Sequence, residues 1–232
     1  LLDMKNNLVE TVQTLHLRES ELSHNVEKAE DLKVKTDELL INAFYQMNKA
    51  MQELKEKEDY IIRFNKIEDQ SQMANIKVTE WRKTYKNIID QNYLEKLNVE
   101  EQTQKYFRSF EDYKDRVLVA VKGKEVLGYS CFDSKEKNFK YDSELVSLYI
   151  KGDYQGNGIG KTLFIETTKE LVSRNKKNMI LWVLADNIRA VNFYKKLGGI
   201  ISETRQAKIG NKTYKEFGFY YDLESLDKEG SF

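Results

Sequence analysis

One short stretch, Tyr154–Thr162, constrains the fold of this chain more than any other, because it places three glycines within five residues. An apolar run, Leu145–Ile150, precedes the stretch, and residues with helical spacing follow it from Leu163. The pattern predicts a strand, a glycine loop and a helix in that order. Bare peptide N–H groups beside a helix N-terminus bind phosphate, so this loop is predicted to hold a phosphorylated cofactor.

Two well-known phosphate-binding motifs do not fit the loop. The nucleotide-binding motif G-x-x-x-x-G-K-[ST] would end at residues 160–162, but it requires glycine where the chain has Gln155. The dinucleotide motif G-x-G-x-x-G needs a spacing that the glycines of the loop do not provide. The sequence therefore predicts phosphate binding without either signature.

The other apolar runs between residues 60 and 223 predict a mixed α/β domain of six or seven strands. The strands are expected at residues 60–64, 117–121, 126–132, 145–150, 179–184, 200–206 and 215–223. Helical spacing predicts helices within 67–89, 93–110, 163–171 and 190–197. The polar tail from Glu224 is expected to be frayed. The glycine loop follows a central strand, which is the usual place for a ligand in an open sheet.

Residues 1–58 predict a long helix, because they include neither proline nor glycine and are rich in good helix formers. Alternating steps of three and four define sixteen seam positions, of which twelve are apolar, and such a seam is typical of a coiled coil. The positions are Leu1, Lys5, Leu8, Val12, Leu15, Glu19, Leu22, Val26, Ala29, Lys33, Thr36, Leu40, Ala43, Met47, Ala50 and Leu54.

This helical segment leaves several arrangements open. The neighbouring polar seam residues Lys33 and Thr36 would allow a break into a helical hairpin. The segment is either an arm that forms a homodimer or docks a partner protein, or a helix folded back on its own domain. It is acidic, whereas the rest of the chain has an excess of bases. This shift predicts a boundary near Asp59, with a coiled-coil-like extension at 1–58 and a domain at 59–232.

Charge and cysteine content narrow the classes of protein. The 38 basic and 38 acidic residues cancel, so the basic footprint of a nucleic-acid-binding protein is missing. The longest apolar runs are too short to span a bilayer, so no membrane partner is expected. A single cysteine, Cys131, excludes an internal disulfide and favours a reducing compartment, so we expect a cytoplasmic protein. No Cys/His cluster has metal-ligand spacing, so no metal is expected.

Within the loop, Gln155-x-x-Gly158-x-Gly160 resembles the (Arg/Gln)-x-x-Gly-x-(Gly/Ala) signature of the GNAT superfamily of N-acetyltransferases. Downstream, Asn187–Gly198 resembles the second conserved motif of that superfamily, and the expected order of elements from 60 to 223 is also similar. Residues 1–58 lie outside the resemblance. It implies the acyl-CoA transferase fold, a mixed α/β sheet, with 59–232 as the N-acetyltransferase domain.

The resemblance implies acetyl-CoA as the donor and direct transfer of its acetyl group to a primary amine. Loop amides would cradle the pyrophosphate, and the end of the strand before the loop would pair with the pantetheine arm. The donor-binding residues so implied are Leu148, Tyr149, Ile150, Gln155, Gly156, Asn157, Gly158, Ile159, Gly160, Lys161 and Asn187. Lys161 either lies near the phosphates or is a solvated helix residue.

Two catalytic residues are implied by the same resemblance. Tyr194 matches a tyrosine that many members place near the sulfur, where it would be a general acid; the alternative is a packing role. Glu144 stands where some members carry the general base that deprotonates the amine; the alternative is a salt-bridge partner.

The acceptor stays open and is expected to be a small-molecule or peptide amine. Trp81, Tyr85, Phe107 and Tyr129 either line the acceptor site or belong to the core. The alternative function is an acetyl-CoA-binding sensor or regulatory module, in which the coiled arm transmits the signal.

Overall fold

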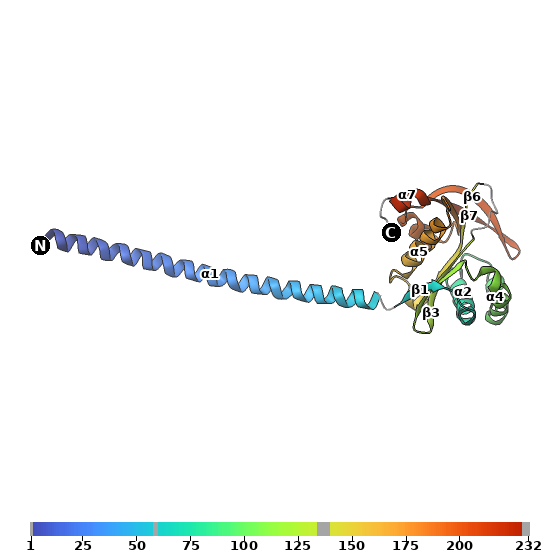
Figure 1. Cartoon of the computed structure of the whole chain (residues 1–232), viewed down its shortest axis with the longest axis horizontal. Helices are drawn as coiled ribbons and strands as arrows, with labels where there is room; N and C mark the ends of the chain where they lie inside the picture. The colour runs from blue at the N-terminus through green and yellow to red at the C-terminus, as the bar shows by residue number, and fades with distance from the viewer. Residues whose placement is uncertain (1, 58–59, 134–139, 229–232) are drawn as a thin grey trace. The chain divides into compact units, whose positions relative to one another are not determined.

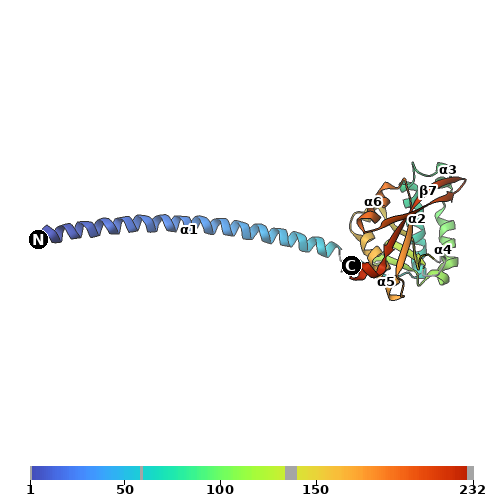
Figure 2. The same ribbon diagram turned by 90° about the horizontal axis from the view of Figure 1, so that it is seen from above.

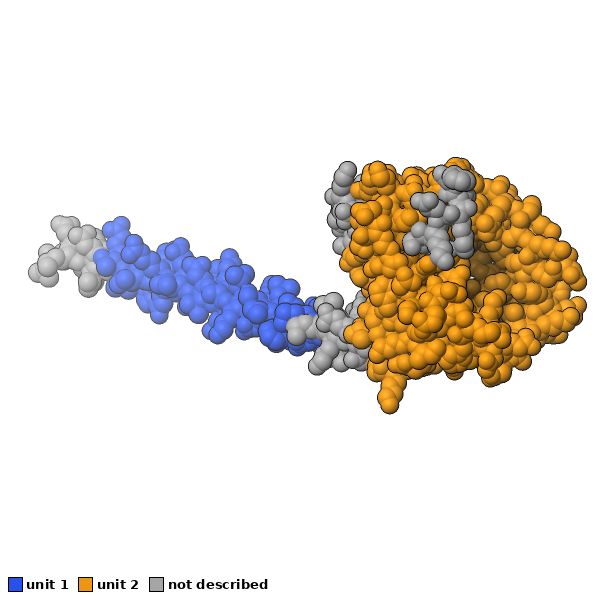
Figure 3. All heavy atoms as spheres, turned by 45° about the vertical axis from the view of Figure 1, so that its right-hand side comes forward, with its two compact units in different colours: residues 1–56 blue, residues 57–232 orange. Residues whose placement is uncertain are grey.

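The computed structural model describes residues 2–57, 60–133 and 140–228, and it divides the chain into two compact units, Leu1–Glu56 and Lys57–Phe232 (Figure 3). The predicted boundary at 58–59 lies outside the described residues. In the part of the chain that is described, no helix is both long enough and apolar enough to cross a membrane.

The first unit is one continuous helix, α1 (Leu2–Lys57). The predicted hairpin break near Lys33 and Thr36 is wrong, because polar seam residues do not interrupt backbone hydrogen bonding in a helix. The Thr36 hydroxyl donates to the carbonyl of Leu32 at 2.7 Å, one turn earlier. All side chains from residue 10 to residue 49 are exposed, and the seam positions outside that range lie outside the described side chains.

The second unit contains a mixed sheet of seven strands in the order β1-β2-β3-β4-β5-β7-β6, which confirms the predicted α/β fold. The strands are β1 (Ile61–Phe64), β2 (Val117–Lys122), β3 (Glu125–Asp133), β4 (Glu144–Ile150), β5 (Asn178–Leu184), β6 (Ile200–Ile209) and β7 (Lys212–Asp222). Only the β4–β5 pair is parallel within the described sheet.

Six helices accompany the described sheet, together with the short 3-10 turns Ile67–Asp69 and Gly152–Tyr154. They are α2 (Gln70–Thr84), α3 (Gln91–Lys96), α4 (Val99–Tyr113), α5 (Ile159–Ser173), α6 (Ile188–Lys196) and α7 (Leu223–Lys228). The last of them corrects the expectation of a frayed tail from Glu224. Asp222 accepts a hydrogen bond from the Glu224 N–H at 3.0 Å, and the fully buried Leu223 ties the helix to the core.

Strand β2 shows how the two faces of the sheet are covered. Val117, Val119 and Val121 belong to a core cluster with residues of α2, whereas Leu118 and Ala120 belong to a second cluster with residues of α5. Alternate residues of a strand point to opposite faces, so both faces are buried. In both views of the ribbon, α5 and α4 lie on opposite sides of the sheet (Figure 1 and Figure 2).

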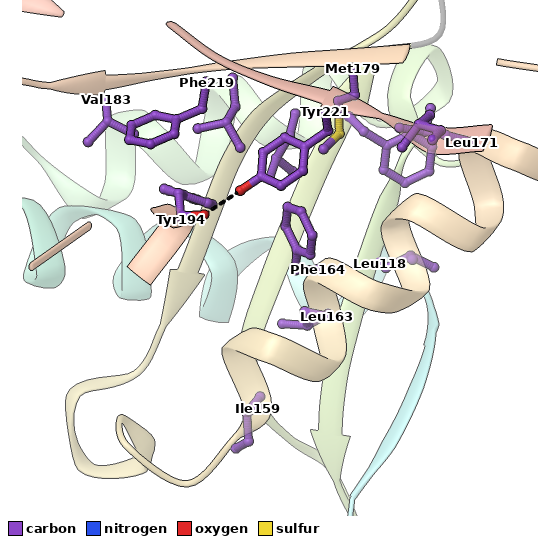
Figure 4. Close-up of a cluster of buried hydrophobic side chains, with 14 of the residues drawn as sticks. Leu118, Ile159, Leu163, Phe164, Leu171, Met179, Val183, Tyr194, Phe219 and Tyr221 are labelled. Atoms are coloured by element: carbon purple, nitrogen blue, oxygen red, sulfur yellow. Dashed lines mark hydrogen bonds between the residues drawn. The ribbon is translucent and has the colours of Figure 1, made fainter. Parts of the chain in front are cut away.

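The core on the α5 face fixes the position of α6. The Tyr221 hydroxyl of β7 donates to the backbone carbonyl of Tyr194 at 2.8 Å (Figure 4). Phe164 of α5 packs against Tyr221 with ring centroids 5.0 Å apart and against Tyr194 at 6.2 Å. These contacts orient α6 so that its aromatic side chains lie beside the ends of β4 and β5.

Candidate active site

The sheet opens between its two central strands. Strands β4 and β5 pair only at Glu144–Ile180 and Leu145–Leu181, so the following residues of β4, 146–150, have no pairing with β5. The β3–β4 register passes from Leu145 to Ser147 and leaves Val146 as the extra residue of a bulge. The structure thus provides backbone groups along one side of β4 that an extended ligand can pair with.

The glycine loop lies directly after this opening. Gly156 and Gly158 have φ angles of +87° and +84°, in the left-handed region that favours glycine. A Cβ atom added to either would meet no protein atom within 4 Å, so the outer surface of the loop is bare. Gly158 is the N-cap of α5, whose first peptide N–H groups lack intrahelical partners. This combination favours an anion, and it fits a pyrophosphate.

Gln155 connects three elements around the opening. Its Nε2 donates to Glu80 Oε2 at 2.8 Å and to the carbonyl of Ile150 at 2.9 Å, while its Oε1 accepts from Arg189 at 2.6 Å. Glu80 is only 7% exposed, and its Oε1 also accepts from the Gly152 N–H at 3.0 Å. Gln155 and Glu80 therefore fasten the loop to α2, β4 and α6.

The structure brings most of the predicted donor-binding residues into one cleft. The cleft is lined by Leu148, Tyr149, Ile150, Gln155, Gly156, Gly158, Gly160, Lys161, Asn187 and Tyr194. Two predicted loop residues do not line it: Asn157 is exposed, and the Ile159 side chain is buried in the core cluster of the α5 face. The buried Ile159 can therefore contribute to the cleft only through its backbone.

Asn187 caps α6 from within the cleft. Its Oδ1 accepts from the Ala190 N–H at 3.2 Å, and its Nδ2 donates to the Tyr85 hydroxyl at 3.4 Å. Burial raises the pKa of the Tyr85 hydroxyl, although the hydrogen bond from Asn187 acts in the opposite direction. Trp81 of α2 and Tyr85, the residue that follows α2, also line the cleft, whereas Phe107 is 40% exposed and lines no part of it.

The Tyr194 hydroxyl is available for chemistry. It lines the cleft, and it has no hydrogen-bond partner among the residues that the structure describes. Burial, with a smaller contribution from Tyr85, raises the pKa of this phenol well above its usual range. Tyr194 consequently stays protonated at neutral pH and can donate a hydrogen bond into the cleft.

The structure does not bring Glu144 into the same cleft as Tyr194. Glu144 is the first residue of β4, partly buried and paired with Ile180 and Asp133, and the lining of the cleft begins at the next residue, Leu145. A direct contact between its carboxylate and a reactant in the cleft is therefore not part of this geometry.

Sequence reasoning missed two residues of the site, Glu80 and Arg189. Glu80 follows Met73 and Ile76 on the buried face of α2, and a carboxylate in that position needs a polar partner. Helical spacing alone could therefore have identified Glu80 as a buried carboxylate. Arg189 lies within the second motif, but its contact with Gln155 depends on how α6 packs and has no local signal.

Among the residues that the structure describes, no group of three or more His, Cys, Asp or Glu side chains is placed to hold a metal ion.

Comparison with known proteins relates this geometry to a family. The model of the "Acetyltransferase (GNAT) family" matches residues 75–199, which is more than half of the 232 residues and includes the loop, β4, β5 and α6. The uncharacterized N-acetyltransferase YuaI of Bacillus subtilis is 32% identical over 174 residues that span 71% of this chain and 95% of the relative.

One relative and one crystal structure, both from Thermoplasma acidophilum, are also similar. A spermidine N(1)-acetyltransferase is 27% identical over 148 residues, which span 62% of this chain and 89% of that protein. The crystal structure of PaiA N-acetyltransferase in complex with coenzyme A has a TM-score of 0.56 and 24% identity, and the match covers 70% of this chain and 98% of that one. The chain belongs to the GNAT family of acetyltransferases and is an acyltransferase.

Proposed function

We propose that this protein is an N-acetyltransferase that transfers the acetyl group of acetyl-CoA directly to a primary amine of a small molecule or peptide. The observation that carries the proposal is the opening between β4 and β5, which has the glycine loop at one end and the unpartnered Tyr194 hydroxyl inside. The lining residues of the cleft lie between Glu80 and Tyr194, within the domain that we propose at 59–232.

The residues of the opening fit acetyl-CoA. The bare amides of the glycine loop and the N-terminus of α5 suit a pyrophosphate, and Lys161 and Arg189 add positive charge at the same end of the cleft. Residues 148–150 leave their backbone groups unpaired toward β5, so they can hydrogen-bond the amides of the pantetheine arm. Asn187, the N-cap of α6, would contact the pantetheine arm from the other side of the cleft. A coenzyme A complex of a relative with the same fold supports this assignment.

The reaction forms a carbon–nitrogen bond and breaks the thioester carbon–sulfur bond. The amine loses a proton as it attacks the thioester carbonyl, and the sulfur leaves as a thiolate that is protonated to the thiol. No covalent acetyl-enzyme is needed in this scheme. We assign polarisation of the carbonyl to backbone N–H groups at the Val146 bulge, because a bulge frees donors from the strand ladder.

Tyr194 would stabilise the departing sulfur. A thiol has a pKa of about 8.5 in water, whereas burial holds the pKa of the Tyr194 phenol above its usual value near 10. Complete proton transfer from Tyr194 to the thiolate is therefore uphill. We assign to Tyr194 a hydrogen bond to the sulfur in the transition state, a narrower role than that of a full general acid.

Glu144 is proposed as the base only through intervening water. Its carboxylate does not line the cleft, although the adjacent Leu145 does. A chain of water molecules would carry the amine proton toward the start of β4.

Acetyl-CoA titration together with thiol release on a panel of amines tests the proposal. We expect binding and turnover, with Tyr194→Phe retaining binding and losing turnover. Absence of binding refutes the donor site. Binding without transfer to any amine refutes the enzyme and favours the acetyl-CoA sensor.

We also propose that α1 is a self-association arm that forms a coiled-coil homodimer. Its described seam includes Val12, Leu15, Leu22, Val26, Leu40 and Met47, which are between 44% and 64% exposed. Exposed apolar residues in one heptad register gain free energy when a second copy covers them. Sedimentation of the full chain tests this idea. A dimer that Leu22→Glu dissociates, but the off-seam Leu17→Glu does not, supports it, whereas a monomeric wild type refutes it.

A further inference from the structure

A second cavity lies on the face of the sheet that α2 and α4 cover. This α2–α4 cavity encloses about 530 Å³ and is lined by Lys77 and Asn65 on one side and Lys105 and Tyr106 on the other. Its volume suits a small molecule. Three residues of β4, Val146, Ser147 and Tyr149, line both this cavity and the donor cleft, so the two hollows meet at the strand bulge.

The charged residues of the cavity are all basic. Lys77 and Lys105 line it, and no aspartate or glutamate does. Lys77 is half-buried; its Nζ lies 5.7 Å from the ring centroid of Tyr106, and it makes no ion pair within the described chain. Burial lowers the pKa of the Lys77 ammonium, and repulsion by Lys105 adds to this effect. An anionic ligand would relieve both penalties.

A buried polar atom at the edge of the cavity points to the same conclusion. Asn65 is only 7% exposed, and its side-chain oxygen has no hydrogen-bond partner among the described residues. Buried carboxamides are normally hydrogen-bonded, so this atom is free to accept from a bound molecule. The cavity thus combines unpaired cations with a free acceptor, and a molecule that carries both an anionic group and N–H donors matches that combination.

We propose that the α2–α4 cavity binds the acetyl acceptor and that the acceptor is a small amine carrying a carboxylate, held by Lys77 and Lys105. The inference rests on the proposed acetyl transfer and adds the class of acceptor. The carboxylate lies between the two lysines, and the amine points along β4 toward the Val146 bulge, where the donor thioester is placed. Amines that carry only positive charge, such as polyamines, meet like charge in this cavity and are poor acceptors.

Pairs of amines that differ only in the carboxylate test the inference. L-Lysine and cadaverine form one pair, and L-ornithine and putrescine form the other. Thiol release from acetyl-CoA gives kcat/KM for each amine with the wild type, Lys77→Met, Lys105→Met and the control Lys169→Met. Lys169 is an exposed lysine of α5, on the opposite face of the sheet, and is ion-paired with Glu166. Thermal melting shows that each variant is folded.

With the wild type we expect the carboxylate member of a pair to have a kcat/KM at least about tenfold higher, the effect of one charge-assisted hydrogen bond. Lys77→Met should bring that ratio close to one without lowering the melting temperature, whereas Lys169→Met should keep it. Equal or better transfer to the diamines, or a preference that survives Lys77→Met, overturns the inference and leaves the proposed function standing. No transfer to any of the four amines also overturns it, and acetyl-CoA titration then shows whether the donor site fails as well.

Discussion

Replacement of Gly158 by alanine is the sharpest test of the donor site. The Gly158 φ angle of +84° costs an L-residue about 1–2 kcal/mol, so Gly158→Ala should lower the melting temperature by about 2–8 °C. The added methyl group meets no protein atom within 4 Å and projects from the bare surface of the loop, where we place the pyrophosphate. Loss of one charge-assisted hydrogen bond to a phosphate costs about 1.5–3 kcal/mol, which raises the Kd for acetyl-CoA about 10- to 150-fold.

Gly198 supplies a matched control. It also has a φ angle of +84°, and a Cβ atom there would likewise meet nothing within 4 Å, but it lies at the C-terminal end of α6 and does not line the cleft. Gly198→Ala should therefore lose the same stability and keep its affinity for the donor. Isothermal titration with acetyl-CoA and thermal melting measure the two effects separately.

Two results would refute this reasoning. An unchanged Kd in Gly158→Ala would show that the loop does not hold the pyrophosphate. An equal loss of affinity in both variants would show that general destabilisation, and not the loop surface, controls binding.

Four further predictions concern other parts of the site. Tyr194→Phe should lower kcat about 10²-fold, measured by thiol release, and leave the Kd for acetyl-CoA within twofold, measured by titration. An unchanged kcat would contradict a hydrogen bond from Tyr194 to the sulfur. Glu144→Gln should lower kcat about 10²-fold and flatten the acidic limb of the pH profile if water connects Glu144 to the amine, whereas an unchanged profile would exclude it as the base. Glu80→Ala removes the acceptor of the Gly152 N–H and one of the two acceptors of the Gln155 amide, so we expect a loss of about 1–3 kcal/mol in the free energy of unfolding and a higher KM for acetyl-CoA. A normal KM would contradict a role of Glu80 in holding the loop. Burial raises the pKa of Tyr106 to about 12, above the unfolded value near 10, so the neutral phenol stabilises the fold fully below pH 10 and that contribution is lost as the pH rises toward 12. Between pH 10 and 12 the Tyr106→Phe variant should therefore lose less free energy of unfolding, measured in urea, than the wild type. Parallel plots of that free energy against pH for the two proteins would contradict the raised pKa of Tyr106.

The sequence predicted those elements whose signal is local. The strands expected at 117–121 and 179–184 are confirmed as β2 and β5, and the glycine loop lies before α5 as expected, because continuous apolar runs and clustered glycines are local signals. The same local reasoning could not decide whether Lys33 and Thr36 break α1. Polar seam residues change the partner preference of a helix, but they leave its backbone hydrogen bonds intact.

Tertiary structure decided which residues form the site. Gln155 meets Glu80 across 75 positions of sequence and Arg189 across 34, and those contacts exist only because α2 and α6 pack on either side of the open strands. Glu144 lies one residue before the first cleft-lining residue of β4, and strand register, which no local pattern encodes, sets that position. The two lysines of the α2–α4 cavity come from different helices, Lys77 from α2 and Lys105 from α4. By itself, then, the sequence determined the fold and the position of the glycine loop for which we propose donor binding, because glycine conformation and apolar period are properties of neighbouring residues. Only the packed structure brought together the residues of the α2–α4 cavity, because they are distant from one another in the chain.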